Sequence, residues 1–179
     1  MVTPKGEDLK EYIRSIPDFP KKGIVFRDIT TLLQNKSSFD RSINLMFEHF
    51  RDRKIDKVVG IEARGFIFAG ALAYRLGAGF VPVRKPRKLP FQTIREEYQL
   101  EYGTDTLEMH TDAIGRGENV LIVDDLIATG GTLQATCKLV ERLGGNLIAL
   151  ACLIELSFLK ARDRFPNLEI YSLMSYDSE

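Results

Sequence analysis

The spacing of apolar residues predicts helices at the start of the chain. Apolar side chains recur every three or four residues between positions 9 and 16, and again between 39 and 50 after Ser37 and Ser38. Residues at this spacing share one face of a helix, and serine is a common residue at a helix start. We therefore expect two amphipathic helices before the first buried strand.

The next stretch predicts a strand, a helix and a second strand. Residues 58–62 and 80–85 form short apolar runs, and residues 65–76 between them form a longer apolar stretch that ends at Gly77. Short apolar runs favour strands, and glycine commonly ends a helix. The order is that of a βαβ unit, in which a helix joins two parallel strands.

A long polar segment follows this unit. Residues 86–99 carry prolines and many charges, so we expect a loop between strands. Leu107 and Met109 then alternate with polar residues, which predicts a partly solvated strand. Loops of this length in a compact domain usually serve a function.

The last third of the chain predicts two buried strands around a helix. Residues 120–123 and 147–154 are almost entirely apolar, residues 132–143 have helical spacing, and residues 170–173 suggest an edge strand. The predicted fold class is α/β, with a mainly parallel central sheet in a three-layer arrangement between helices. No internal repeat or linker interrupts the chain, so we expect one domain over residues 1–179.

Composition limits the possible partners. The chain has 179 residues, zero formal net charge and no long basic tract, which argues against binding to duplex nucleic acid. No apolar run approaches the ~18 residues of a membrane span, and the amino terminus lacks a signal-peptide core. Cys137 and Cys152 suggest neither a disulfide framework nor a zinc cluster. We expect a cytoplasmic protein with two reduced, buried cysteines.

The segment VLIVDDLIATGGT, residues 120–132, combines a buried strand, two carboxylates and a small-residue turn that opens a helix. Ligands of open parallel sheets bind outside the carboxyl ends of the strands, and a helix start attracts anions. Glycines let several backbone N–H groups converge on one phosphate, and threonine hydroxyls add donors. The predicted phosphate-binding residues are Ala128, Thr129, Gly130, Gly131 and Thr132.

The acidic pair of this segment must bind something other than phosphate. Carboxylates repel phosphate but accept hydrogen bonds from vicinal hydroxyls, which places a ribose at Asp124 and Asp125 and predicts a ribose 5-phosphate ligand. Taken singly, a Gly-Gly turn is weak evidence and an Asp pair more often caps a helix or faces solvent. The segment has neither the Gly-Lys-Ser/Thr of a nucleotide P-loop nor the glycine spacing of a dinucleotide site.

The same segment closely resembles the signature of type I phosphoribosyltransferases. Four further blocks, at residues 17–29, 60–68, 83–90 and 100–103, resemble those of the family's adenine-specific members in the same order. The resemblance implies the type I fold, with a flexible active-site loop and a small N-terminal hood. It also implies conversion of adenine and 5-phosphoribosyl 1-pyrophosphate to AMP and pyrophosphate, in purine salvage, through an oxocarbenium-like transition state. Related enzymes are homodimers, and we expect the same here.

Two basic segments are candidates for binding pyrophosphate. Arg64 offers a guanidinium between two small residues at a strand end, although it could equally be a surface residue. Resemblance to the family's pyrophosphate loop, which has an unusual peptide geometry, favours binding. A charge run at 84–88 is usually a solvated face, but this one opens a long loop; many family members have glycine in place of Arg87, which favours Lys88. The candidates are Ala63, Arg64, Gly65, Arg84, Lys85 and Lys88.

Base recognition is expected at Val25, Phe26 and Arg27. The Phe26 ring could stack on a purine, although an aromatic residue here could equally belong to the core. Resemblance to adenine enzymes implies that backbone groups of Val25 and Arg27 pair with the exocyclic amine and a ring nitrogen. A site satisfied by a 6-amino group leaves polar atoms unpaired when it meets a 6-oxopurine, so strong discrimination is expected.

The segment 86–99 has a mechanistic reason to act as a lid. Water would capture an oxocarbenium-like centre unless something excluded it. The resemblance implies that Glu101 and Tyr102 close over the reaction centre, with Glu101 exchanging a proton with the purine. From the sequence alone, Glu101 would more often be a solvated strand residue.

No dedicated metal ligands are evident in the sequence. His49 and His110 lie far from any acidic cluster, so Mg²⁺ is expected to bind mainly through phosphoribosyl pyrophosphate. Two alternatives are a 6-oxopurine phosphoribosyltransferase and a regulator that senses phosphoribosyl pyrophosphate and binds nucleic acid. The blocks VFRD and LEYG argue against the first, and the neutral charge without an added basic segment argues against the second.

Overall fold

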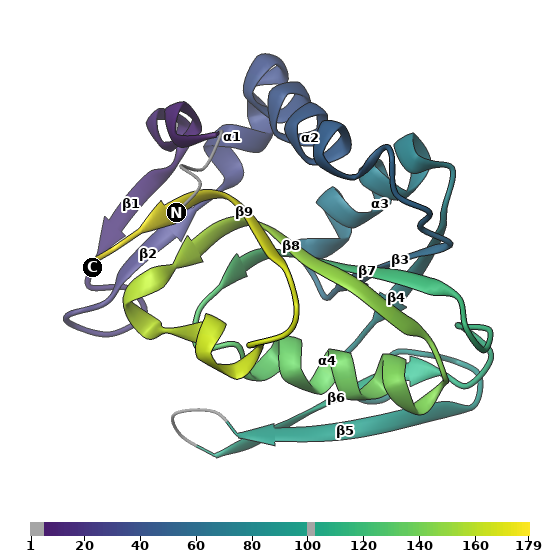
Figure 1. Cartoon of the computed structure of the whole chain (residues 1–179). Coiled ribbons are helices and arrows are strands. Elements are labelled where there is room, and N and C mark those ends of the chain that lie inside the picture. Colours follow the sequence, from purple (N-terminus) through teal and green to yellow (C-terminus); the bar gives the residue numbers. More distant parts are fainter. Residues whose placement is uncertain (1–5, 100–102) are drawn as a thin grey trace.

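The computed structural model describes residues 6–99 and 103–179, and a five-stranded parallel sheet forms its centre (Figure 1). The strand order is β4-β3-β7-β8-β9, and every neighbouring pair is parallel. The strands are β3 (Lys57–Ile61), β4 (Gly79–Val83), β7 (Asn119–Ile127), β8 (Asn146–Leu156) and β9 (Ile170–Tyr176). The predicted βαβ unit and the edge position of the last strand are confirmed.

Helices cover both faces of this sheet and complete the three layers. Helices α2 (Lys36–Phe50) and α3 (Gly65–Leu76) lie over one face, and α4 (Gly131–Arg142) lies over the other (Figure 1). Successive residues of a strand point to opposite faces. Leu121 and Val123 accordingly join the core under α2 and α3, whereas Val120 and Ile122 join the core under α4. The continuous apolar run of β7 is explained by this burial on both sides.

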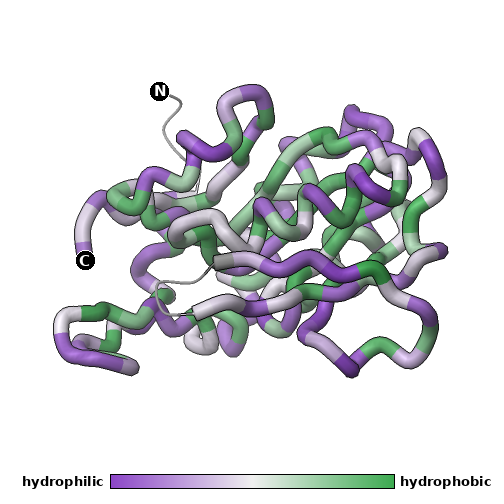
Figure 2. Tube along the Cα trace, turned by 90° about the horizontal axis from the view of Figure 1, so that it is seen from below, coloured by the Kyte–Doolittle hydropathy of each residue, from purple (hydrophilic) through white to green (hydrophobic). Residues whose placement is uncertain are grey.

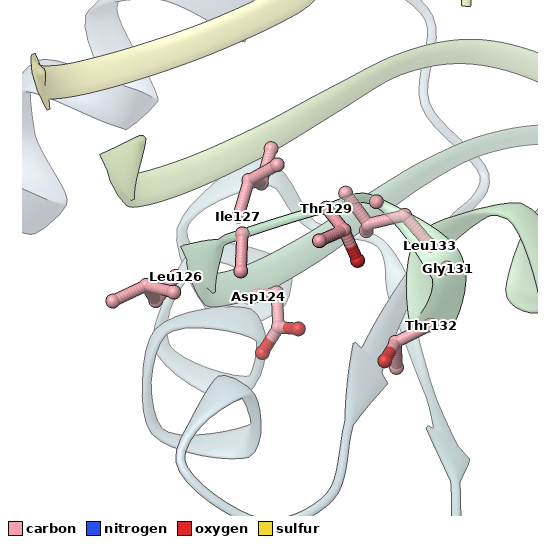
Figure 3. A pocket seen from close by; sticks show the side chains of 9 residues that line it. Asp124, Leu126, Ile127, Thr129, Gly131, Thr132 and Leu133 are labelled. Carbon is pink, nitrogen blue, oxygen red and sulfur yellow. The ribbon is translucent and has the colours of Figure 1, made fainter. Parts of the chain in front are cut away.

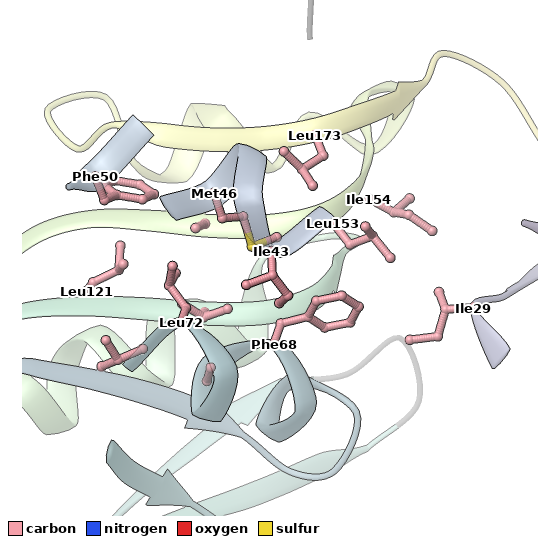
Figure 4. Close-up of a cluster of buried hydrophobic side chains, with 14 of the residues drawn as sticks. Ile29, Ile43, Met46, Phe50, Phe68, Leu72, Leu121, Leu153, Ile154 and Leu173 are labelled. Atoms are coloured by element: carbon pink, nitrogen blue, oxygen red, sulfur yellow. The ribbon is translucent and has the colours of Figure 1, made fainter. Parts of the chain in front are cut away.

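The core between α2, α3 and the sheet is built from large aliphatic and aromatic side chains. Phe50 and Met46 of α2 and Phe68 and Leu72 of α3 are fully buried against Leu121 (Figure 4). Cys137 and Cys152 are buried in the other core and are free cysteines, as expected. No helix of the described residues is both long enough and apolar enough to cross a membrane.

The amino-terminal segment differs from the prediction. Only a short 3-10 helix, η1 (Glu7–Tyr12), forms, and β1 (Arg14–Pro17) follows it where a helix was expected to continue. Ile16 lies opposite Phe26 in the antiparallel pair of β1 with β2 (Val25–Asp28). Pairing with a distant strand outweighs a helical pattern of little more than two turns. This small hood continues into α1 (Thr30–Gln34) and lies beside the end of β9 (Figure 1).

The prediction of a loop over residues 86–99 is wrong in its second half. Residues 93–99 form β5 (Thr93–Gln99), which pairs antiparallel with β6 (Thr104–His110) and packs on α4. Ile94 and Tyr98 face the core, while Arg95 and Glu97 between them are exposed. Charged residues on the solvent face of a two-stranded sheet produced the polar composition that favoured a loop. Figure 2 views the domain from below, the side on which the hairpin lies in Figure 1, and shows hydrophilic and hydrophobic residues alternating along the chain.

Candidate active site

The residues predicted to bind the ribose and its phosphate lie with Arg64 where β3 and β7 end and α3 and α4 begin. Strand β7 extends to Ile127, so Asp124 and Asp125 lie within the carboxyl-terminal part of the strand, where the sequence predicted them. Its last residues stay ordered because they pair with β8, with Asp124 opposite Cys152 and Ile127 opposite Glu155. The acidic pair is therefore held by a central strand and not by a loop.

The turn that is predicted to bind phosphate leads directly into α4. Gly130 adopts a left-handed conformation (φ 84°) and takes the N-cap position, which favours glycine. No side chain caps the helix and its first turn has no acidic residue, so N–H groups at this helix start are free to bind an anion. Figure 3 shows Asp124, Thr129 and Thr132 around the same small cavity of about 80 Å³. Its lining residues are Asp124, Leu126, Ile127, Ala128, Thr129, Gly130, Gly131, Thr132 and Leu133.

A short segment packs against the back of this turn. A Cβ added to Gly130 would lie 3.1 Å from Phe165 and 3.3 Å from Ala161, which belongs to η3 (Ala161–Arg164). Both guanidinium contacts from Arg162 to the buried Glu155 are 2.7 Å long and fix η3 to the end of β8. Glu155 was not predicted from the sequence, although a carboxylate directly after the apolar run 147–154 was an available signal.

Asp124 and Asp125 lie against the loop that precedes α3. A Cβ added to Gly65 would lie 2.7 Å from Asp124 Oδ1 and 3.2 Å from Asp124 Cα, so only glycine fits there. Arg64 Nε lies 2.8 Å from Asp125 Oδ2, an ion pair without the alignment of a hydrogen bond. The structure therefore joins the predicted ribose and pyrophosphate residues directly.

Burial controls the acidity of this pair. Burial, reinforced by the charge of Asp125, raises the pKa of Asp124 well above its ordinary value. Burial also raises the pKa of Asp125, although the guanidinium of Arg64 opposes this rise. A ligand that donates hydroxyl hydrogens to these oxygens would stabilise their ionised forms.

The basic candidates gather around Glu62, the last residue before the predicted pyrophosphate loop. The peptide bond between Glu62 and Ala63 is cis, in agreement with the unusual geometry that the resemblance implies. The Glu62 carboxylate accepts hydrogen bonds from the side chains of Arg84 and Lys88 and from the backbone N–H of Lys85. Glu62 had no role predicted from the sequence, because nothing in its local pattern reveals a partner more than twenty residues away.

The pKa of Glu62 leads to a prediction about acid stability. Burial alone would raise this pKa, but hydrogen bonds from Lys88, the Lys85 N–H and Arg84 outweigh burial and lower it to about 2, below the ordinary 4.5. A carboxylate with a depressed pKa stabilises the fold above its unfolded-state value, and this contribution is lost as pH falls from 4.5 through 2. We expect Glu62→Gln to lower the free energy of unfolding by about 1 kcal/mol near neutral pH and by less at about pH 3.

Urea unfolding of the parent and the Glu62→Gln variant at both pH values measures this contribution. An equal difference in unfolding free energy at the two pH values would show that the charge of Glu62 does not stabilise the fold.

Lys85 is held differently from the other cations. Its ammonium group contacts Asp105 of β6 and lies 3.0 Å from the hydroxyl of Tyr98 on β5. The structure thus places Arg84, Lys85 and Lys88 at one end of the site but ties Lys85 to the hairpin. Glu101 and Tyr102, the predicted proton-transfer and lid residues, lie outside the described residues.

The predicted base-binding strand lies next to the pyrophosphate loop. The Phe26 ring centroid is 5.3 Å from the guanidinium carbon of Arg64 and 5.2 Å from the ring of Phe19. The Arg27 side chain is buried, donates to Ser15 at 2.6 Å and stacks over Tyr176 at 4.0 Å. The side chain of Arg27 thus anchors β2 to β1 and to the end of β9.

Comparisons with known proteins show the family to which the chain belongs. The model of the phosphoribosyl transferase domain family matches residues 28–173. An adenine phosphoribosyltransferase of Acidobacterium capsulatum is 59% identical over 170 residues, which cover 95% of this chain and 94% of that protein. The enzyme of the same name from Thermotoga maritima is 57% identical over 169 residues, which cover 94% of this chain and 98% of that protein.

Solved structures give the same result. The crystal structure of adenine phosphoribosyltransferase from Thermoanaerobacter pseudethanolicus has a TM-score of 0.92 and 53% identity, covering 94% of this chain and 98% of that one. The enzyme from Saccharomyces cerevisiae, complexed with an imino-altritol bisphosphate and adenine, has a TM-score of 0.88 and 43% identity, covering 93% and 97%. The chain belongs to the phosphoribosyl transferase family, and within that family to the adenine phosphoribosyltransferases.

Proposed function

We propose that this protein transfers the 5-phosphoribosyl group of phosphoribosyl pyrophosphate to N9 of adenine, releasing pyrophosphate and forming AMP. The observation that carries this proposal is the contact of Arg64 with both Asp125 and the face of Phe26. A ribose, a pyrophosphate and a base would meet at these three side chains. The whole chain would act as one phosphoribosyltransferase domain.

The ribose 5-phosphate is expected to bind between the acidic pair and the start of α4. The turn at 128–132 would take the phosphate through backbone N–H groups and hydroxyls, while Asp124 and Asp125 accept the ribose hydroxyls. The buried Oδ2 of Asp125 has no aligned hydrogen-bond donor and can accept one from the sugar. Its charge would also stabilise the positive anomeric carbon as pyrophosphate leaves.

The pyrophosphate is expected to bind to the cations at the other side of the acidic pair. Arg64, flanked by Ala63 and Gly65, would bind it together with Arg84, Lys85 and Lys88. Arg64 is the residue that spans both subsites, because it already contacts Asp125. Departure of pyrophosphate would thus be coupled to the charge on the ribose side.

Adenine is expected to bind along β2. Residue Phe26 would stack on the ring, and backbone groups of Val25 and Arg27 would pair with its polar edge. Val25 and Arg27 are two positions apart on β2, with Phe26 between them. Their backbone groups therefore face the same edge of the strand. A hydrogen-bonding edge of this kind can discriminate against a 6-oxopurine by roughly 10⁴-fold.

We propose that Glu101 exchanges a proton with the purine and that Tyr102 helps to close the site. Replacing Glu101 with alanine is expected to reduce kcat by about 100-fold, a typical size for loss of a general acid or base. Binding of phosphoribosyl pyrophosphate should persist, since no predicted contact to it is removed. Calorimetry on the variant, together with its kcat, measures both effects, and loss of binding would contradict this role.

Mg²⁺ is proposed as the cofactor, bound mainly through the substrate. Among residues 6–99 and 103–179, no group of three or more His, Cys, Asp or Glu side chains could hold a metal ion. The buried Oδ2 of Asp125, which has no aligned hydrogen-bond donor, would accept a hydrogen bond from a ribose hydroxyl of the metal–substrate complex. When bound, Mg²⁺ would neutralise charge on the pyrophosphate leaving group.

We further propose a cytoplasmic homodimer that binds no nucleic acid and no membrane. Large apolar side chains of α3 and β4 remain exposed, with Tyr74 at 86%, Phe80 at 41% and Ile67 at 40%. Exposed apolar clusters of this kind are typical of protein–protein contacts. Light scattering coupled to gel filtration measures the oligomeric state.

Turnover of adenine, hypoxanthine, guanine and xanthine with phosphoribosyl pyrophosphate, with and without Mg²⁺, tests the proposed function. Of the four bases, we expect only adenine to be converted, to AMP, and we expect this reaction only when Mg²⁺ is present. Turnover of a 6-oxopurine would retain the ribose-phosphate site and overturn the assignment of β2. Binding of phosphoribosyl pyrophosphate without turnover of any base would favour a sensor of this metabolite.

A further inference from the structure

Glu62 is the common partner of three groups from the segment 84–88. Its Oε2 accepts from the Lys85 backbone N–H at 3.0 Å, and its two oxygens accept from Arg84 Nε and Nη2, both at 3.3 Å. Its Oε1 also contacts the ammonium group of Lys88. Only 10% of the Glu62 side chain is exposed, so the carboxylate is enclosed by these partners.

The contacts of Glu62 determine the shape of the segment that carries the cations. Arg84 also donates to the carbonyl oxygen of Lys88 at 3.3 Å, which closes a turn around the carboxylate. Arg87 has a left-handed backbone (φ 67°) within this turn. The side chains of Arg84 and Lys88 are 33% and 46% exposed, so their charged ends would otherwise sample many rotamers in solvent.

We propose that Glu62 is a positioning residue that gathers the pyrophosphate-binding cations before phosphoribosyl pyrophosphate arrives. This inference rests on the proposed function, since it assigns a supporting role within the same site. Glu62 directly follows β3 and precedes Ala63 and Arg64, so its carboxylate is anchored to the same backbone that forms the other half of the pyrophosphate site. One buried anion thereby fixes the distance between two basic segments.

Removing the negative charge of Glu62 has two opposing effects on the binding of pyrophosphate. One effect would strengthen binding and the other would weaken it. Loss of Glu62 makes the site more positive, which by itself would strengthen binding of an anion. Loss of Glu62 also releases Arg84 and Lys88, which must then be ordered again by the ligand. Because both side chains are long and partly exposed, we expect the ordering cost to dominate.

The variant Glu62→Gln separates these effects. The amide can still accept from the Lys85 N–H, but it has no charge and presents a donor to Arg84 or Lys88. We expect the Kd of inorganic pyrophosphate with Mg²⁺ and the KM of phosphoribosyl pyrophosphate to rise about tenfold. The KM of adenine should stay within about twofold, because the cations that Glu62 holds belong to residues 84–88 and not to β2.

Glu108→Gln is the matched control. Glu108 is buried to 5% exposure and accepts from the Arg87 backbone N–H at 3.1 Å, so it supports the same turn. Its ion-pair partner is Arg95 at 3.9 Å, and it bonds to none of the proposed pyrophosphate-binding side chains. We expect this variant to bind pyrophosphate within about twofold of the parent.

Calorimetry with inorganic pyrophosphate and steady-state kinetics on both variants test whether Glu62 positions the cations. Unchanged or tighter pyrophosphate binding in Glu62→Gln overturns the inference, as does an equal loss in Glu108→Gln. If Glu62→Gln does not fold, Glu62→Asp takes its place and should weaken pyrophosphate binding while adenine binding is retained; parent-like pyrophosphate binding would overturn the inference. Failure of the parent protein to use phosphoribosyl pyrophosphate would instead refute the proposed function.

Discussion

Replacing Asp125 with asparagine is expected to lower kcat/KM for phosphoribosyl pyrophosphate by 100- to 1,000-fold, roughly the cost of losing a group that stabilises developing charge. The change keeps the shape of the side chain but removes the charge that faces Arg64 at 2.8 Å. Loss of this charge would weaken contact with the ribose hydroxyls and with the positive anomeric carbon. Steady-state kinetics with varied phosphoribosyl pyrophosphate at saturating adenine measures the effect.

Asp56→Asn provides a control, because Asp56 directly precedes β3 and contacts the opposite end of β7. The Asp56 carboxylate accepts from the backbone N–H of Asn119, the first residue of β7, at 2.8 Å. An asparagine can keep this hydrogen bond, so kcat/KM should remain close to that of the parent. Comparable losses in both variants would mean that Asp125 matters for the integrity of β7 and not for the reaction.

The sequence predicted the central part of the fold because its pattern there has one physical interpretation. The run at 120–123 is apolar on both strand faces, and only a sheet covered by helices on both sides satisfies it. The helix 65–76 was predicted at its observed bounds, since Gly77 adopts the left-handed conformation that ends it. At residues 120–123 and 65–76, the structure that the local sequence favours is the structure that the folded domain adopts.

Predictions failed where partners distant in sequence decide the structure. The helical pattern at 9–16 gave way to β1 because Ile16 pairs with Phe26 of β2. Strand β5 was interpreted as a loop because its charged residues face solvent while Ile94 and Tyr98 face the core. In both cases the pattern was short and the deciding contact lay elsewhere in the chain.

The residues of the candidate site likewise include some that the sequence predicted and some that depend on distant partners. Motifs indicated the turn at 128–132, the acidic pair and Arg64, because each residue type there has its own chemical reason to bind a ligand part. Glu62 and Glu155 were missed because their roles depend on contacts with Lys88 and Arg162, which form only in the folded chain. Residues that support a site are harder to predict from sequence than residues that touch a ligand.

The second large effect is expected from Gly65→Ala. The new methyl group would lie 2.7 Å from Asp124 Oδ1 and 3.2 Å from both Asp124 Cα and the Val123 carbonyl oxygen. Two of these neighbours are backbone atoms of the central strand, so α3 must move away from β7. We expect a loss of about 2 kcal/mol in unfolding free energy, typical of overpacking. Activity should fall about 100-fold at temperatures where the variant remains folded, because misplacement by about 1 Å has that cost.

Gly70→Ala tests whether this effect belongs to the position or to any added methyl group on α3. An added Cβ at Gly70 meets no atom within 4 Å, and the residue lies inside the helix. Alanine there should raise the unfolding free energy by about 1 kcal/mol through helix propensity and leave kcat unchanged. Denaturant unfolding and kinetics on both variants distinguish the cases. If Gly65→Ala keeps parent activity, close approach of α3 to Asp124 is not required for catalysis, and the ribose site tolerates a shift of the pyrophosphate loop.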